Sequence, residues 1–558
     1  MMTMSHDSNP SNISIAWRNL NYEAKNLFYN RKLILRQLNG HLNYQSLNGF
    51  LGPSGAGKTT LLNCLNGTLR SGITSNSEIY LNPKEQQAPV IRMIEQNIHE
   101  TILSQMTIRQ VLYYAFRFKN DSRHFSMMDR HIKNVLSELL LDESILDNRF
   151  ELCSGGEQKR VAIAQELMSL QQPSFLFIDE PTTGLDSNSA LLVIQCLRRL
   201  VDHNDRLTIL VSIHAPSSDI LNLFDKLYIL SKGGVCIYSD EPKNLQIKLE
   251  TNCHCELSEE KPAIEEYLKI ACHGIGNKLV RQLAQTIVND EQIKAPLSQI
   301  RSHLKFMNRG IQRNRKSLRM GDLFLQTYRM FDILLVTEYR KLIIQIILLA
   351  LLSTILKSSF NPKMVRPETC VPIDVYENES YSKCFDELND EDYNSQYKAF
   401  MGHSILDFSL ILIIINIVSF LQILKVFRNE HRNQWYSLGA FYIPFSIVHF
   451  IELSFISAYI VVLLYFLIDH SYVDGNQMNW YRLGNMIYFR WMYDLYLQSF
   501  ALLMSLIFSE NINLAFIAGA FTAQTLHVFS GSLYNLEQMK NPALKMLANL
   551  LNSKVPVN

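Results

Sequence analysis

The apolar positions of this chain are distributed unevenly, and they divide it into two parts. The first three hundred or so residues alternate short apolar runs with polar stretches, as in ordinary soluble sequence. From Leu342 onward the chain collects long apolar runs with few charges. A helix of about 20 apolar residues is long enough to cross a bilayer. The pattern therefore predicts a soluble first half followed by an all-α, polytopic membrane half.

Five runs are predicted to span a membrane, at about 342–360, 404–424, 442–468, 486–508 and 512–529. The loop between the second and third runs is basic, with Lys425, Arg428, His431 and Arg432. By the positive-inside rule this loop should be cytoplasmic, which puts the acidic loop 358–399 outside. That outer loop holds Cys370 and Cys384, which could pair there, and a glycosylation sequon at Asn378.

In the soluble half the strongest motif is GPSGAGKT, which follows the apolar strand pattern SLNGFL and precedes the helix pattern TLLNCLNGTL. This strand, loop and helix order is the context that a phosphate-binding P-loop requires. Glycines let the backbone wrap phosphates, Lys58 supplies a charge, and the Thr59 hydroxyl can ligate Mg²⁺. The predicted nucleotide contacts are Gly52, Pro53, Ser54, Gly55, Ala56, Gly57, Lys58, Thr59 and Thr60.

Two carboxylates follow a second apolar run, in FLFIDEP. A buried parallel strand delivers the residues at its end to the carboxyl edge of the sheet, so an α/β fold is expected. Asp179 is the candidate for holding Mg²⁺, and Glu180 for the general base that polarises water. Without the P-loop, two acids in a turn after a strand would be the better interpretation.

A further stretch, LCSGGEQKR, looks like the start of a second anion-binding helix. Backbone N–H groups and the helix dipole at Ser154, Gly155, Gly156 and Glu157 would face a negative group. With these motifs in order, the chain resembles an ATP-binding-cassette (ABC) transporter, whose signature CSGGEQKR matches. The resemblance implies an α/β P-loop ATPase domain, the ABC nucleotide-binding domain, that uses ATP and Mg²⁺. It also implies that the signature binds ATP held on the P-loop of a second nucleotide domain.

Other positions match that family one by one. Gln96 in IEQN matches the family's glutamine that contacts Mg²⁺ and the membrane domain. Asp186 in GLDS matches the residue that reaches across the dimer. His214 matches the switch histidine that contacts the γ-phosphate. Tyr22 is a candidate for stacking on adenine. Because the chain has one copy of each motif, a productive site is expected to need a second half-transporter, identical or different.

Three features of the chain resemble the White-type half-transporters of subfamily G. They are the order of the two halves, the sequence DEPTTGLDS and the sequence FRNEHRNQWYS. The resemblance implies dimers that move a lipid-like or amphipathic molecule, in the plasma membrane more than in vesicles. Candidate path residues are Phe408, Asn416, Phe420, Phe516 and Phe521. The family has six spans and the sixth is absent here, so the alternative is a truncated, non-transporting or regulatory subunit that pairs with another half-transporter.

The expected organisation is a disordered tail at 1–14, the nucleotide-binding domain at 15–270, a linker at 271–321 and the membrane domain at 322–558. The net charge of +1 gives no sign of a nucleic-acid partner. A soluble ABC ATPase acting on ribosomes or DNA is disfavoured by the apolar runs. Cys253, His254 and Cys255 lack the usual zinc spacing, so no structural zinc is predicted.

Overall fold

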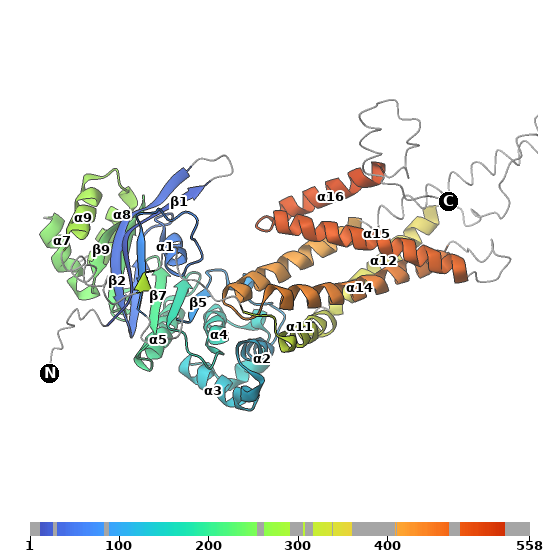
Figure 1. The fold of residues 1–558 in the computed structure, drawn as a ribbon, viewed down its shortest axis with the longest axis horizontal. Coiled ribbons are helices and arrows are strands. Elements are labelled where there is room, and N and C mark those ends of the chain that lie inside the picture. Colours follow the sequence, from blue (N-terminus) through green and yellow to red (C-terminus); the bar gives the residue numbers. More distant parts are fainter. Residues whose placement is uncertain are drawn as a thin grey trace, which may run out of the picture. The chain divides into compact units, whose positions relative to one another are not determined.

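The structure, a computed structural model, describes residues 12–25, 31–82, 89–253, 262–290, 305–306, 316–337, 339–359, 408, 410–467 and 480–529. It contains two compact units. The first comprises Met1–Leu318 together with Arg428–Leu438, and the second comprises Arg319–Phe427 and Gly439–Asn558. Figure 1 shows the strands within the first unit and the long helices within the second. The fold class predicted from the sequence is confirmed.

The first unit is built on two sheets. The larger has the order β5-β6-β7-β3-β8-β9, and its first five strands run parallel while β9 (Val235–Asp240) is antiparallel to β8. Those five strands are β5 (Ile91–Ile94), β6 (Phe175–Asp179), β7 (Thr208–Ile213), β3 (Ser46–Leu51) and β8 (Lys226–Ser231). The strands β3, β6 and β7 are buried along their whole length, as expected for a parallel sheet covered on both faces.

The smaller sheet is antiparallel, with the order β10-β4-β1-β2. Its strands are β1 (Ile13–Lys25), β2 (Arg31–Asn43), β4 (Glu78–Leu81) and β10 (Lys305–Phe306). Trp17 of β1 joins the two sheets, because its ring packs edge-on against Phe50 at 6.2 Å and Tyr228 at 5.5 Å. Gly40 opposite leaves room for this ring, since a Cβ there would lie 2.4 Å from it.

Helices surround the larger sheet. Those that position the site are α1 (Lys58–Leu65), α2 (Ile108–Lys119), α4 (Gly155–Leu167), α5 (Ser187–Asp202) and α9 (Lys278–Asn289). The others in this unit are α3 (Met128–Glu138), α6 (Ser218–Leu221), α7 (Leu245–Cys253) and α8 (Ala263–His273).

Two expected boundaries were wrong. The tail 1–14 runs too far, because β1 begins at Ile13 and the Ser14 hydroxyl donates to the Leu42 carbonyl inside the core. Part of the segment predicted as a linker, 271–321, is folded into the first unit. There α9 buries Val280, Leu283 and Ile287. Their i, i+3, i+7 spacing is that of an amphipathic helix, a signal that was readable in the sequence.

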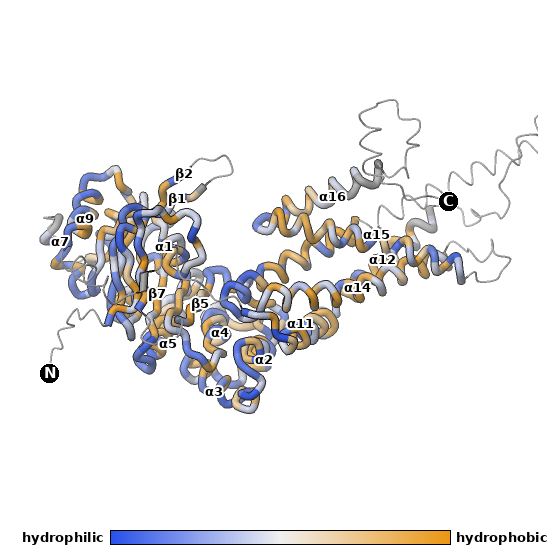
Figure 2. The backbone as a smooth tube through the Cα atoms, viewed as in Figure 1, coloured by the Kyte–Doolittle hydropathy of each residue, from blue (hydrophilic) through white to orange (hydrophobic). Residues whose placement is uncertain are grey.

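The second unit contains α11 (Met320–Asp332), α12 (Tyr339–Ser359), a helix at Leu410–Arg432 that continues into the first unit, α14 (Leu438–Leu467), α15 (Trp480–Ile507) and α16 (Ile512–Phe529). Five of these helices overlap the five predicted spans. Among the described residues, Leu410–Arg432 and α14 are long and apolar enough to cross a membrane, while Leu342–Ile355 and Ile512–Thr522 are shorter apolar segments. Figure 2 shows the apolar character of these helices.

Candidate functional site

The P-loop lies between β3 and α1 and depends on two glycines. Gly52 has φ 144° and Gly57 has φ 100°, both in the region that favours glycine. A Cβ on Gly52 would lie 2.2 Å from the Leu230 carbonyl oxygen, and one on Gly57 would lie 2.8 Å from the Leu35 side chain. The backbone of the loop is therefore held close to β8 and β2, where it forms the cradle that the motif predicts.

Lys58 turns its ammonium group back into this cradle. Its Nζ donates to the carbonyls of Gly52 at 2.8 Å and Pro53 at 3.3 Å, and lies 3.3 Å from Nδ1 of His214. Burial lowers the pKa of Lys58, while the charges of Glu180 and Asp179 oppose this effect. The ammonium group thus lies within the loop, between its backbone carbonyls and the His214 ring.

Asp179 and Glu180 stand at the carboxyl end of β6, as the sequence predicted, and both are buried. The hydroxyl of Ser212 on β7 donates to Asp179, and the Glu180 N–H donates to that hydroxyl at 2.9 Å. Glu180 has φ 47°, which is unusual for a residue with a side chain. Ser212 therefore bridges the Asp179 carboxylate and the backbone of Glu180 at this turn.

Glu180 is the centre of the cluster. Nε2 of His214 lies 2.5 Å from one carboxylate oxygen. Nε2 of Gln96 donates to the other at 2.7 Å, and the Thr183 hydroxyl donates to the same oxygen at 3.1 Å. Because Nδ1 of His214 faces the Lys58 ammonium group, its partners favour the tautomer with the proton on Nε2.

The residues matched to the signature lie at the start of α4. Ser154 caps α4 in a capping box, in which its N–H and hydroxyl donate to Glu157 at 2.8 and 2.7 Å. Gly155 and Gly156 face Leu185 and Ser189, so that a Cβ on either would come within 3.2 Å of them. Within the described residues, no hydrogen bond joins Ser154 to the cluster around Glu180.

Asp186 caps the neighbouring helix α5 by accepting a hydrogen bond from the Ser189 N–H at 2.9 Å, and this bond lowers its pKa. Tyr22, the adenine candidate, is buried, and its ring packs against Gly72. Two candidate metal positions, Asp179 and Gln96, belong to the cluster, while Thr59 at the start of α1 is exposed.

The segment Arg428–Leu438, here called the docking segment, belongs to the first unit, although it lies between two helices of the membrane half. Asn433 is fully buried and binds the backbone of Met93 on β5 through two hydrogen bonds of 2.8 and 3.0 Å. Arg92 donates to the Asn433 carbonyl at 2.8 Å, and Arg432 pairs with Glu95 beside Gln96. The segment thus contacts the strand that leads into Gln96. The sequence predicted a basic cytoplasmic loop here but not these partners.

A buried charge cluster lies next to it. Lys119 on α2 has its Nζ 3.0 Å from the Glu166 carboxylate and 4.4 Å from the centre of the Trp435 ring. Trp435 donates from Nε1 to Glu166 at 3.3 Å. Burial is the main cause that lowers the pKa of Lys119 to about 7. Glu166 stands on α4, so the docking segment also contacts the helix that begins at the signature.

In the second unit the predicted path residues differ in environment. Phe408 and Phe420 are buried among other side chains, whereas Phe516 and Phe521 are exposed to 37% and 72%. Asn416 is half-buried. The residues Cys370, Cys384, Asn378, His254 and Cys255 and the segment 530–558 lie outside the described residues.

Two pairs of ionisable side chains contact each other in this unit. Arg490 and Asp494 of α15 form an ion pair at 2.9 Å, and the Ser457 hydroxyl of α14 donates to the same carboxylate at 2.7 Å. His449 and Glu452, one turn apart on α14, lie 2.9 Å from each other. A charged side chain within a membrane-spanning helix costs free energy unless it is paired. Each of these four side chains has a partner.

Comparison with known proteins agrees with this organisation. Residues 35–183 match the family model of the ABC transporter domain, and residues 325–553 match that of the ABC-2 type transporter. ABC transporter G family member 11 of Arabidopsis thaliana is 34% identical over 37% of this chain and 29% of its own length. G family member 1 of Dictyostelium discoideum is 30% identical over 40% of this chain and 29% of its own length. The chain therefore spans less than a third of the length of either relative.

Among solved structures, cbiO1 of Clostridium perfringens, described as part of the ABC transporter complex cbiONQ, is similar to the chain. It is 21% identical and covers 46% of this chain and 99% of its own, with a TM-score of 0.36.

Proposed function

We propose that this chain, which belongs to the ABC transporters and has the domain order of their G family, is an ATP-hydrolysing half-transporter. The observation that supports this most directly is the arrangement around Glu180, whose two carboxylate oxygens are held by His214 and Gln96 within reach of the P-loop lysine. A carboxylate fixed in this way suits a general base, because its position and its charge are both set before the reaction.

The residues present fit ATP and Mg²⁺. The loop can lie this close to β8 and β2 only because Gly52 and Gly57 carry no Cβ, and Lys58 lies inside it with its ammonium group on backbone carbonyls. Thr59, Gln96 and Asp179 are the proposed holders of Mg²⁺, directly or through water. When bound, the ion would neutralise charge on the phosphate oxygens.

In this proposal Glu180 accepts a proton from the attacking water. His214 keeps the carboxylate in place through its Nε2 proton and bridges it to Lys58. Gln96 holds the other oxygen, and its own backbone carbonyl accepts a hydrogen bond from Lys159 of α4 at 2.7 Å. His214 and Gln96 orient the base, and Lys58 stabilises the charge that develops on the transferred group.

A second copy, or a different half-transporter, would complete the site. The signature residues from Ser154 to Glu157 have their hydrogen-bond partners in α4 itself, apart from the P-loop cluster. The neighbouring Leu152 is 74% exposed although it is apolar, and Asp186 is exposed as well. An apolar side chain exposed beside an anion-binding helix start favours a partner surface there.

Coupling to the membrane half is assigned to the docking segment. It contacts β5, which leads into Gln96, and α4, which starts at Ser154, so nucleotide-dependent changes at either place reach Asn433 and Trp435. The chain continues from this segment directly into the helix Leu410–Arg432 on one side and α14 on the other. The transported molecule is proposed to be lipid-like or amphipathic, with the plasma membrane as the proposed location and the ATPase unit in the cytosol.

The test is vanadate-sensitive phosphate release by the full chain in lipid nanodiscs. We expect turnover by the parent chain, a loss of about a hundredfold or more in Glu180→Gln, and parental turnover in Glu250→Gln on the surface of α7. Undiminished release by Glu180→Gln would refute the role given to that residue. If the parent is silent alone but active with a co-purified half-transporter, the dimer is heteromeric; silence in both samples would favour the non-transporting subunit.

A further inference from the structure

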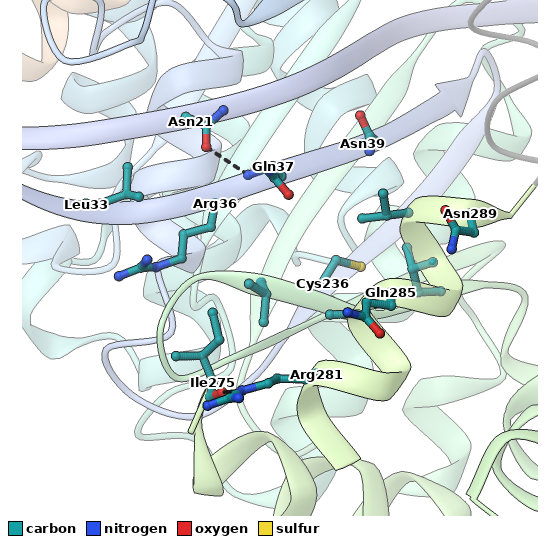
Figure 3. Close-up of a pocket in the computed structure, with 14 residues that line it drawn as sticks. Asn21, Leu33, Arg36, Gln37, Asn39, Cys236, Ile275, Arg281, Gln285 and Asn289 are labelled. Atoms are coloured by element: carbon teal, nitrogen blue, oxygen red, sulfur yellow. Dashed lines mark hydrogen bonds between the residues drawn. The ribbon is translucent and has the colours of Figure 1, made fainter. Parts of the chain in front are cut away.

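A cavity of about 410 Å³ lies in the first unit between β2, β9 and α9. Figure 3 shows the side chains that line it. It shares no residue with the P-loop, the signature or the cluster around Glu180. Its volume lies in the range typical of small-molecule sites. The cavity is therefore separate from the proposed nucleotide site.

Its charge is positive. Arg36 and Arg281 are the charged residues of the lining, which includes no Asp or Glu. In Figure 3 both guanidinium groups project to the same side. Within the described part of the chain, neither has a carboxylate within ion-pair distance. Two cations in the wall of one cavity attract a negatively charged group.

Each arginine is anchored by a hydrogen bond from its Nε and has further N–H donors on its terminal nitrogens. Arg36 donates from Nε to the Gly233 carbonyl at 3.1 Å. Arg281 donates from Nε to the Ile275 carbonyl at 2.8 Å, with a longer bond from one terminal nitrogen to Gly276. Among the described residues, the terminal nitrogens of Arg36 have no hydrogen-bond partner. A guanidinium group anchored in this way is preorganised for binding a phosphate oxygen.

The rest of the lining is rich in amides, which suit hydroxyl groups. They are Asn21, Gln37, Asn39, Gln285 and Asn289. Asn21 accepts a hydrogen bond from the Gln37 N–H at 2.9 Å and donates to the Asn19 carbonyl at 2.8 Å, so its amide belongs to the frame of the cavity. Cys236 is part of the wall, and its buried thiol donates to the Tyr238 carbonyl at 3.1 Å. Amides both donate and accept hydrogen bonds, as hydroxyl groups require.

We propose that this cavity binds a phosphomonoester attached to a hydroxyl-bearing body, with Arg36 and Arg281 on the phosphate and the amides on the hydroxyls. A soluble sugar phosphate and a phosphatidic acid headgroup share the phosphomonoester chemistry. The site lies close to the nucleotide loop through β2, because Leu35, next to Arg36, is the residue that packs against Gly57.

The test uses calorimetric titration of the full chain in detergent, with a non-hydrolysable ATP analogue and Mg²⁺ present at saturation so that the P-loop is closed to the probes. The two probes are glucose 6-phosphate and dioctanoyl phosphatidic acid. The variants are Arg281→Glu, at an exposed position of α9, and the control Lys278→Glu, the same charge change on the same helix outside the cavity.

We expect at least one probe to bind the parent and Lys278→Glu equally, and to bind Arg281→Glu about tenfold to a hundredfold more weakly. Binding of glucose 6-phosphate identifies a soluble ligand, and binding of phosphatidic acid alone identifies a lipid headgroup. Binding of neither probe, or equal binding to Arg281→Glu, overturns the proposal. The affinity of each variant for the ATP analogue, measured in the same samples, separates local loss of the site from loss of folding.

Discussion

Asn433 binds the backbone of Met93 as a neighbouring strand would: its side-chain amide donates to the Met93 carbonyl at 2.8 Å and accepts from the Met93 N–H at 3.0 Å. Met93 is on β5, one of the two edge strands of the larger sheet. An edge strand has outward N–H and C=O groups that need partners. One asparagine, far away in the chain, supplies both.

Asn433→Ala should therefore loosen the docking segment. The change leaves two buried backbone groups of Met93 without partners, at a cost of about 1–3 kcal/mol each. We expect faster hydrogen exchange at Met93 and reduced stimulation of ATP turnover by lipid, while basal turnover persists. Asn222→Ala, at an exposed position after α6, is the matched control. Unchanged exchange at Met93 would contradict the role assigned to the amide.

Lys119 should make the stability of the first unit depend on pH. Its pKa in the folded chain is lowered to about 7 from an ordinary value of 10.5. Between these values the unfolded chain holds a proton that the folded chain lacks, so the free energy of unfolding rises with pH, by at most about 1.4 kcal/mol per unit.

Lys119→Met should remove this contribution. The measurement is the midpoint of thermal unfolding of the full chain between pH 7 and 8.5, in which we expect the variant to show a flatter profile than the parent. The control is Lys133→Met, whose exposed partner is Glu143 at 2.8 Å. Parallel profiles for parent and Lys119→Met would show that this ammonium group does not titrate in the window.

Gly52 and Gly184 offer a matched pair for the P-loop. Both have positive φ, but a Cβ on Gly52 meets the Leu230 carbonyl oxygen at 2.2 Å, whereas one on Gly184 meets nothing within 4 Å. Gly184→Ala should cost only the backbone strain, about 1 kcal/mol. Gly52→Ala should cost about 3 kcal/mol or more and abolish binding of a fluorescent ATP analogue. Analogue binding by Gly52→Ala at parental affinity would contradict the geometry of the cradle.

Replacing one partner of the ion pair in α15 should lower the free energy of unfolding strongly, whereas replacing both partners should lower it little. Asp494→Leu leaves Arg490 buried without its carboxylate, and we expect a loss of about 3–5 kcal/mol. The double variant Arg490→Met with Asp494→Leu should regain most of it. Thermal aggregation of the full chain in detergent measures both. If the double variant is as unstable as the single one, the pairing is not the cause.

Local motifs were predictable because their physics is local. SLNGFL and FLFID correspond residue for residue to β3 and β6, and the strand before His214 is β7. The grouping of Lys58, Glu180, Gln96 and His214 follows from parallel strands ending at one edge. That grouping agrees with the roles proposed for these residues, and the experiments above test those roles.

Long-range pairings gave no such signal. Asn433 is 340 residues from its partner Met93, and nothing in FRNEHRNQWYS indicates that one of its amides completes an edge strand. The same holds for the cavity beside α9, whose lining comes from four separate stretches of the chain. Its two arginines look like ordinary surface cations in the sequence, because only the fold places both in the wall of one cavity.

The docking segment also sets an order of events during synthesis. The main part of the first unit is complete when the ribosome passes Leu318, yet the unit also requires 428–438. At about 5–20 residues per second, several seconds separate the two. In that interval Arg92, Lys119 and Glu166 lack their cover, and the edge of β5 has open hydrogen-bonding groups. The nascent ATPase unit is then exposed to aggregation and to chaperones until the second predicted span has been made.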